Sequence, residues 1–416
     1  MTSFPSSGQL DPAVLRSRAY LSRVAEPASI PVWAFVQQVG PVAAADAIRR
    51  GSAPASVGSA TEARRDHADP DIDLETAQRH GIRLVAPESS DWPHFAFAGL
   101  ERCAIRRARD HERGPFTASG SGEPVPPLAL WVKGCGDLAG IGVRSVAIVG
   151  SRAATPYDEH VTADLAYGLG GRGVVIVSGG AYGIDAVAHR SALAGQGQTV
   201  VVSAGGLDRP YPVGNAFLFE RAAESGLVVS ESPPGCAPQR HRFLTRNRLI
   251  AAFSTGTVVT EAAIRSGAAN TAAHAFTIGR PVMAVPGPIT SPMSVGCHAL
   301  LRREPDAAQL VTSVDDVMAV VGSIGEGLPV AGLGTVLDGD LRAELDRLDP
   351  TARRVFDALP SRRPARPDEL ALRSGVSAVE VIRALPVLDL ADLMDVSDAG
   401  YRIAARLRPA RRPRTG

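Results

Sequence analysis

Short apolar runs alternate with amphipathic stretches between Val146 and Ala284. Each run is rich in β-branched residues and is closed by a small or polar residue, which is typical of a buried strand. A stretch with helical spacing follows each run, so the pattern predicts a doubly wound α/β fold with a mostly parallel sheet and helices on both faces. In such a fold, ligands bind in the crevice beyond the carboxyl ends of the strands. The runs are VAIVG, VVIVSGG, TVVVSAGG, LVVSE and GTVVTE.

The segments on either side of this core predict further domains. With 416 residues, the chain is longer than one ordinary domain. Its N-terminal part shows helical spacing, and its C-terminal part has the pattern of three helices followed by a strand, a turn and a strand, which is the plan of a winged helix. We expect a helical module with a linker at 1–75, a core at 76–322 with a flexible insertion at 102–127, a hinge at 323–340, a winged helix at 341–404 and a disordered basic tail at 405–416.

The charge balance excludes a general attraction of the whole molecule to nucleic acid or membrane. Lys and Arg together number 44 and Asp and Glu 43, so a polyanion has to be held by a local cluster. Lys133 is the only lysine, and it lies outside the Gly-rich turns. The chain therefore lacks the lysine of a Walker A loop, of a Schiff-base enzyme and of a protein kinase.

Neither a metal nor a nucleotide cofactor is expected. Cys103, Cys135, Cys236 and Cys297 lie far apart, which favours reduced structural thiols. A literal GxGxxG at Gly168–Gly173 ends a helical pattern, whereas the dinucleotide fingerprint opens a helix, so we interpret it as a helix end and a turn. The chain start lacks the features of a signal peptide, and no apolar run approaches membrane-spanning length, so we expect a cytoplasmic protein with no membrane partner.

Two turns at predicted strand ends have the composition of a phosphate site. GSR, at 150–152, lies where the first core strand turns into the first core helix, and unpaired amides together with an arginine favour an anion there. The alternative is a tight turn with a solvated arginine. SGGAYGID, at 178–185, lacks side chains over one turn, which permits either close approach to a ligand or close packing of helix on sheet. The candidate residues in these turns are Gly150, Ser151, Arg152, Ser178, Gly179, Gly180 and Gly183.

The segment HRFLTRNRLIAA brings three arginines to the start of an apolar helix. Arg246 and Arg248 are two residues apart on this helix and therefore cannot face the same way. Beside a crevice, the arginines form a track for a nucleic-acid backbone; the alternative is ion pairing with Glu231 or Glu261. The candidates from this segment are Arg242, Arg246, Asn247 and Arg248.

Glu261 follows the strand GTVV and has three candidate roles. In order of preference, its carboxylate holds an arginine of the RNR sequence, caps a helix, or acts on a ribose hydroxyl. The last role belongs to an enzyme. His189 is interpreted as a buried structural histidine, because no GxSxG nucleophile elbow accompanies it.

Seven segments in fixed order closely resemble the DNA-processing protein A family, also called DprA or Smf. The resemblance covers about Val146 to Leu301 and extends more weakly to the N-terminal module and the C-terminal winged helix. The segments are VAIVGSR, VVIVSGGAYGIDAVAH, LDRPYPVGN, VVSESPPG, RFLTRNRLIAA, TVVTEAAIRSGAANTA and MAVPGP.

This resemblance implies an extended Rossmann-like core, a sterile-alpha-motif-like N-terminal module and a non-enzymatic function. It implies a homodimer that binds single-stranded DNA and helps to load RecA recombinase onto strands covered by single-strand-binding protein, in natural transformation and recombination. By position in the motifs, Arg152, Ser178 and the neighbouring glycines, Arg246 and Arg248 would line the phosphate pocket.

Two other functions stay open. The segment STGTVVTE partly matches the GGxGTxxE signature of nucleotide-processing N-glycosidases of the lysine-decarboxylase-like group, with Ser254 and Thr255 in place of the glycines. A sequence-specific winged-helix regulator is the other alternative. Against it, the predicted recognition helix and wing carry negative charges that repel phosphate, from Glu380, Asp389 and Asp395. This favours protein contact or structural support.

Overall fold

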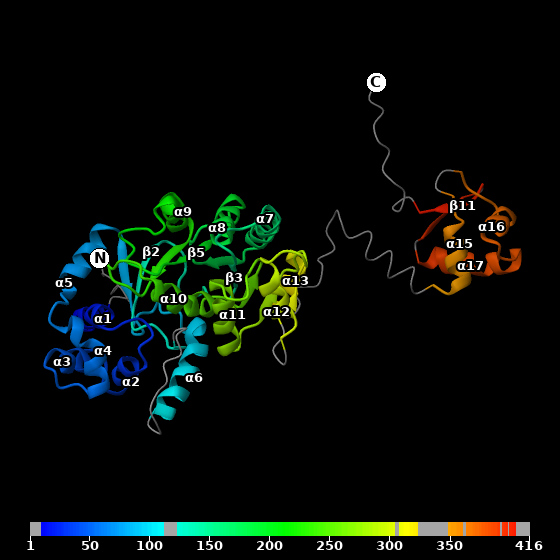
Figure 1. Cartoon of the computed structure of the whole chain (residues 1–416). Helices are drawn as coiled ribbons and strands as arrows, with labels where there is room; N and C mark the ends of the chain where they lie inside the picture. Colours follow the sequence, from blue (N-terminus) through cyan, green and yellow to red (C-terminus); the bar gives the residue numbers. More distant parts are fainter. Residues whose placement is uncertain are drawn as a thin grey trace, which may run out of the picture. The chain divides into compact units, whose positions relative to one another are not determined.

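The computed structural model describes residues 10–111, 123–303, 308–322, 348–360, 363–391, 393–397 and 399–404. The chain divides into two compact units, 1–327 and 328–416, which are described separately (Figure 1). The predicted hinge at 323–340 and the predicted tail at 405–416 lie outside the described residues. No helix among the described residues is both long and apolar enough to span a lipid bilayer.

Unit 1 is built on a nine-stranded sheet in the order β1-β2-β6-β5-β4-β3-β7-β8-β9. From β6 to β9 all neighbouring strands are parallel, while β1 and β2 add an antiparallel edge. The predicted α/β class with a mostly parallel sheet is confirmed. The strands are β1 (Ile82–Val85), β2 (Leu130–Gly134), β3 (Ser145–Val149), β4 (Val175–Ser178), β5 (Thr199–Val202), β6 (Leu227–Ser230), β7 (Gly256–Val259), β8 (Val282–Ala284) and β9 (Gln309–Leu310).

The order of the strands creates a switch point between β3 and β7. From β3 the chain adds β4, β5 and β6 on one side, and then returns to add β7 on the other side of β3. The connections after β3 and β7 therefore diverge to opposite faces of the sheet. This divergence opens a crevice at their carboxyl ends.

Helices cover both faces of the sheet, as Figure 1 shows. Val146 and Ile148 of β3 belong to the core beneath α7 and α8, whereas Ala147 and Val149 belong to the core beneath α10 and α11. Burial on both faces explains why the strands are continuously apolar rather than alternating. The helices of this core are α7 (Pro156–Gly171), α8 (Ile184–Ala194), α9 (Ala216–Ser225), α10 (Arg240–Ala252), α11 (Gly267–Thr277), α12 (Val295–Leu301) and α13 (Val314–Val321), with a 3-10 turn, η1 (Val213–Asn215).

The GxGxxG sequence is a helix end, as predicted. Helix α7 ends at Gly171, and Arg172 caps it through its backbone amide. Gly173 has a φ of 72°, a left-handed conformation that favours glycine, and β4 begins two residues later. The sequence does not open a helix and has no geometry for a dinucleotide.

Five helices form the N-terminal module, packed around Tyr20, Leu21, Val36 and Ile48. The polar stretch at 51–73, expected to be a linker around a further helix, contains α4, which buries only Val57 and Thr61, and the first residues of α5. The helices are α1 (Pro12–Val24), α2 (Ile30–Val39), α3 (Pro41–Arg49), α4 (Ala55–Arg65) and α5 (Pro70–Arg79).

The predicted flexible insertion at 102–127 is corrected in its first part. Helix α6 (His94–His111) continues through residues 102–111, and residues 112–122 lie outside the described residues. The helix buries Phe97, Leu100 and Ala104 at helical spacing. Its outer face is rich in arginine, and because disordered segments have a similar composition, the sequence did not indicate a helix here.

Unit 2 is a winged helix, as predicted. Three helices and a two-stranded antiparallel hairpin surround a core that includes Val355, Leu370, Val381 and Leu388. Pro386 lies within the third helix, and the helix continues past it. The elements are α15 (Pro350–Asp357), α16 (Pro367–Ser374), α17 (Ala378–Leu390), β10 (Met394–Ser397) and β11 (Gly400–Ile403).

His189 is a fully buried structural histidine on α8. Its Nδ1 lies 2.6 Å from the Thr199 hydroxyl, which itself donates to the Ile176 carbonyl, so Nδ1 carries the proton. Burial, and next the nearby Arg246, lower the pKa of His189 from 6.5 to about 3. The folded chain therefore holds this imidazole neutral.

Replacing His189 should change how stability depends on pH. Because the folded pKa lies below the unfolded one, stability is complete above about pH 6.5 and is lost as the pH falls toward 3. Between about pH 6.5 and pH 5, this one group should cost the wild type about 2 kcal/mol of unfolding free energy. In His189→Leu, denaturant unfolding at both pH values should show a correspondingly smaller loss. Equal losses in the two proteins would contradict the assignment.

Candidate nucleic-acid interface

A crevice of about 750 Å³ opens at the carboxyl ends of β3 and β7, at the switch point of the sheet. Its lining comes mainly from the turn after β3, the turn after β4, helix α10 and the loop between β7 and α11, with Tyr211 from the loop after β5 and Met293 from the loop before α12. Charged groups in its lining are four arginines and one aspartate: Arg152, Arg240, Arg246, Arg265 and Asp185. The crevice is therefore electropositive and large enough for part of a polynucleotide.

The GSR turn supplies an exposed arginine beside aromatic rings. Gly150, Ser151 and Arg152 all line the crevice, and Arg152 is exposed. The Arg152 guanidinium carbon lies 5.4 Å from the centre of the Phe243 ring, whose own centre is 5.6 Å from that of Tyr211. This turn thus places a cation and two flat apolar surfaces at one side of the crevice.

The SGG turn packs against the protein instead of facing the crevice. The Ser178 hydroxyl is buried and donates to the Ile148 carbonyl at 2.7 Å. Gly183 has a φ of 74°, and a Cβ on it would lie 2.3 Å from the Ser151 carbonyl oxygen, so its glycine lets the two turns touch. A Cβ on Gly180 would meet Phe219. Ser178, Gly179, Gly180 and Gly183 are absent from the crevice lining, and close packing is the alternative that the geometry favours.

Arg246 forms the floor of the crevice. Its guanidinium is buried and donates to the carbonyl oxygens of Gly179, at 2.7 Å, and of Val202. A Cβ on Gly179 would lie 2.6 Å from this guanidinium, so the glycine makes room for it. Burial lowers the pKa of Arg246 to about 10 despite the attraction of Asp185, so the guanidinium remains charged at neutral pH.

Arg242 and Arg248 do not face the crevice, which corrects their predicted role. Arg248 is completely buried, and its two Nη atoms lie 2.8 and 2.6 Å from the Glu231 carboxylate. Arg242 makes a bidentate contact with the Glu26 carboxylate through its Nε and Nη2 atoms, at 3.1 and 2.7 Å. Both arginines therefore form structural ion pairs, which was the alternative prediction. Glu231 was one of the two acids expected, whereas Glu26 was not.

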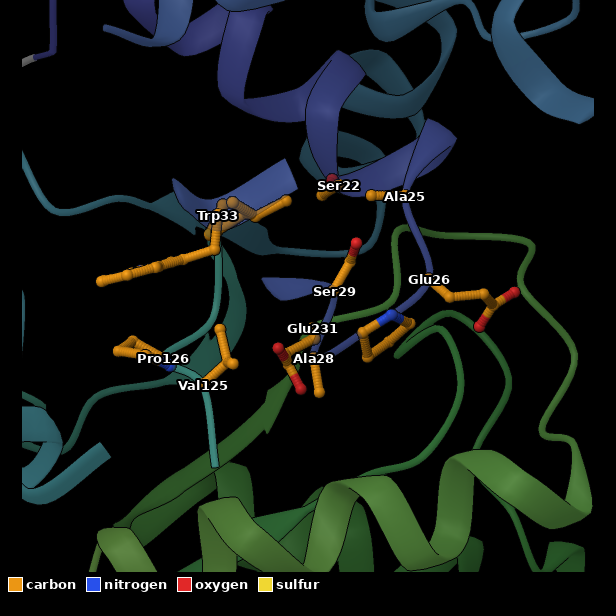
Figure 2. A pocket seen from close by; sticks show the side chains of 12 residues that line it. Ser22, Ala25, Glu26, Ala28, Ser29, Trp33, Val125, Pro126 and Glu231 are labelled. Carbon is orange, nitrogen blue, oxygen red and sulfur yellow. The ribbon is translucent and has the colours of Figure 1, made fainter. Parts of the chain in front are cut away.

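Both acids line a small cavity between the N-terminal module and the core, shown in Figure 2. Glu26 comes from the loop after α1, and Glu231 directly follows β6. The cavity measures about 20 Å³, which admits about one water molecule and no nucleotide. Burial alone would raise the pKa of Glu26, but hydrogen bonds from Arg242 and Arg64 lower it to about 2. These contacts attach the module to the core.

Asn247 lines the crevice and also joins its two flanking helices. Its amide nitrogen donates to the Gly267 carbonyl at 3.2 Å and to the Asn270 side-chain oxygen at 3.0 Å, which connects α10 to α11. The residue therefore fixes the width of the crevice between these helices.

Sequence reasoning missed four residues of the crevice. Arg240 and Arg265 are exposed and line it, as do the aromatic rings of Tyr211 and Phe243. All four lie within or directly beside motifs already recognised, but no periodicity indicates which member of such a motif faces the crevice. A search for arginines close in sequence to aromatic residues would have indicated Arg240 and Phe243, but not Arg265.

Glu261 is buried and has a structural role. Its carboxylate accepts a hydrogen bond from the Thr155 amide at 3.1 Å, near the start of α7, and it holds no arginine. It also contacts Asp158, and burial raises the pKa of both carboxyl groups. A group with no access to the crevice cannot act on a ribose hydroxyl, so the N-glycosidase alternative loses its base. Among the described residues, no three His, Cys, Asp or Glu side chains are placed to hold a metal ion.

In unit 2, helix α17 exposes an apolar and mixed-charge face. The large apolar side chains Val379, Ile382 and Val387 are 61, 57 and 44% exposed. The exposed charged residues of the same helix are Glu380, Arg383 and Asp389. A helix that reads the major groove needs cationic and polar side chains, so protein contact or structural support remains the prediction for this helix.

Comparison with known proteins gives a consistent result. The family model "DNA recombination-mediator protein A" matches residues 115–322, and the model "DprA winged helix domain" matches residues 340–396. A DNA processing protein DprA from Mycobacterium tuberculosis is 47% identical over 95% of each chain. Protein Smf from Escherichia coli is 35% identical over 68% of this chain and 73% of its own length. The X-ray structure of DNA processing protein A from Streptococcus pneumoniae aligns with a TM-score of 0.58 and 28% identity, covering 75% of this chain and 98% of that one.

Replacing Arg248 should destabilise the fold strongly, whereas replacing Arg152 should hardly change its stability. Arg248→Ala leaves the Glu231 carboxylate buried without its partner, which should lower the free energy of unfolding by about 3–5 kcal/mol. Arg152→Ala removes an exposed side chain and should change it by about 0.5 kcal/mol or less. Denaturant unfolding measures both effects.

A paired substitution provides the control. Arg248→Met combined with Glu231→Leu removes both charges and should recover much of the lost stability. Equal unfolding midpoints for Arg248→Ala and the wild type would show that the ion pair is not structural.

Proposed function

The chain belongs to the family of DNA recombination-mediator protein A, also called DprA or Smf, and we propose that it binds single-stranded DNA in the crevice and loads RecA recombinase onto that DNA. The binding step is supported by the geometry of the crevice. The loading step is what the family resemblance implies.

The observation that carries the proposal is the set of exposed arginines around one opening. Arg152, Arg240 and Arg265 are exposed, line the same crevice and have no acidic partner among the residues that the structure describes. Arginine binds phosphate oxygens through two parallel hydrogen bonds. The charged Arg246 beneath them adds a fixed positive charge that costs no reorganisation when the ligand binds.

The aromatic rings favour an unpaired strand over a duplex. Tyr211 is 49% exposed, and Phe243 also lines the crevice. Bases stack on such rings only when they are not already stacked within a duplex, and stacking contributes about 1–3 kcal/mol per base. Stacking accepts every base, so binding should show little sequence preference.

We further propose that the protein acts by binding and not by catalysis. The two residues considered for chemistry, Glu261 and His189, are fully buried, and each makes a hydrogen bond within the core. RecA, a second copy of the chain and single-strand-binding protein are the proposed protein partners, in the cytoplasm.

The affinity for single-stranded DNA should depend steeply on salt through the exposed arginines. Arg152→Ala combined with Arg265→Ala should weaken binding to all sequences about equally and reduce the slope of log K against log salt by about 1.4, at about 0.7 per lost contact. Fluorescence anisotropy over a salt series measures this. Arg190→Ala combined with Arg221→Ala removes the same charge from helices α8 and α9 and should leave the slope unchanged.

The loading step has its own test. Strands covered by single-strand-binding protein should assemble RecA filaments faster when the wild-type chain is added, and the Arg152→Ala, Arg265→Ala variant should lose this acceleration. Acceleration without measurable DNA binding would contradict the proposed order of events.

A further inference from the structure

A second set of exposed arginines lies on helix α6. Arg102, Arg106 and Arg109 are exposed and are spaced four and three residues apart, so they share one face of the helix. Arg107, on another side of the same helix, pairs with Glu123. The three exposed arginines have no acidic partner among the described residues.

Two arginines from other elements extend this set. Arg280 lies with its guanidinium carbon 5.3 Å from the centre of the Phe95 ring, and Arg303 lies 4.7 Å from the centre of the Phe276 ring. Helix α6 packs directly on this region, because the Cys103 thiol donates to the carbonyl at the end of α11 at 3.4 Å. Arg280 and Arg303 thus lie beside this contact, and the arginines of α6 continue from Arg102 along the helix away from it.

No ion pair among the residues that the structure describes neutralises this cluster. Burial, and next the neighbouring Arg102, lower the pKa of Arg280, which shows that the two cations are close enough to repel each other. Repulsion among like charges is a cost that a bound polyanion removes. Phe95, at the edge of the cluster, is 56% exposed and offers an apolar surface beside the cations.

The cluster lies at the opposite edge of the sheet from the crevice. Arg280 precedes β8 by two residues, and Arg303 lies in the connection from α12 to β9, so both are on the side of the sheet where the parallel strands begin. The crevice lies at the carboxyl ends. A strand held in the crevice thus reaches the cluster only by continuing around the molecule.

We propose that Arg102, Arg106 and Arg109, together with Arg280 and Arg303, form a second binding surface for a nucleic-acid backbone. Guanidinium groups in a row along a helix match successive phosphates, and the exposed ring at one end accepts a base or a sugar. The ligand is either a distal part of the strand held in the crevice or a separate DNA molecule. Both present the same phosphate chemistry.

The test compares DNA lengths in the full chain. The triple variant Arg102→Ala, Arg106→Ala, Arg109→Ala should bind an oligonucleotide of about six residues, which fills only the crevice, as tightly as the wild type. It should bind an oligonucleotide of about 40 residues or a duplex more weakly, with the slope of log K against log salt reduced by about 2. The crevice variant Arg152→Ala, Arg265→Ala should instead lose the short oligonucleotide, so failure of one site is distinguishable from failure of the other.

A matched control separates this surface from net charge. The variant Arg172→Ala, Arg190→Ala, Arg221→Ala removes three exposed arginines from the α7 to α9 side of the sheet and should retain the long-strand affinity. If it loses as much as the α6 variant, or if the α6 variant retains full long-strand affinity and salt slope, the proposal is overturned. The proposal also fails if the α6 variant keeps DNA binding but loses binding of polyglutamate, since the partner would then be an acidic protein.

One more measurement identifies which DNA molecule supplies the second backbone. With a short strand already filling the crevice, capture of a labelled duplex by the wild type and not by the α6 variant would identify a separate molecule. Loss restricted to the long single strand would identify a continuation of the same strand.

Discussion

The buried guanidinium of Arg246 is the contact on which the crevice depends. Parallel strands end in carbonyl groups that no neighbouring strand satisfies, and this side chain binds those of Gly179 and Val202, after β4 and at the end of β5. The glycine at 179 leaves the space that the guanidinium fills. One arginine therefore closes the sheet edge, supports the turns above it and supplies a permanent charge below the ligand.

Three arginines of helix α10 have three different environments, and the helical period explains why. Arg246 points to the sheet edge, Arg248 points to Glu231, and Arg242 points to Glu26 on the N-terminal module. Burial without a partner costs far more than a surface ion pair contributes, so each inward-facing arginine has an acid or backbone carbonyls around it. Binding is left to arginines on loops and at the first turn, where no such constraint applies.

Much of the fold followed from the sequence, because buried parallel strands are short, β-branched and closed by small residues. The strands β3 to β7 and the position of the crevice needed no other information. The candidate site was predicted only in part: Gly150, Ser151, Arg152, Arg246 and Asn247 line the crevice as expected. For the misassigned arginines, the sequence does not decide between phosphate and an acid elsewhere in the chain: Glu26 is 216 residues from Arg242, and Glu231, an expected alternative, is 17 residues from Arg248. The prediction for the SGG turn was wrong because glycine permits close packing as well as close approach to a ligand. The prediction for helix α6 was wrong because its arginine-rich outer face has the composition of a disordered segment.

The ion pair between Glu26 and Arg242 makes the charge of the core depend on the N-terminal module. The acid accepts from Arg64 and Arg242 at once, so it belongs to both the module and the core. A shortened chain that begins after the module would leave the Arg242 guanidinium without the Glu26 carboxylate, one helical turn from Arg246. The N-terminal helices therefore supply the carboxylate that neutralises Arg242, and the core without them would carry one more uncompensated positive charge.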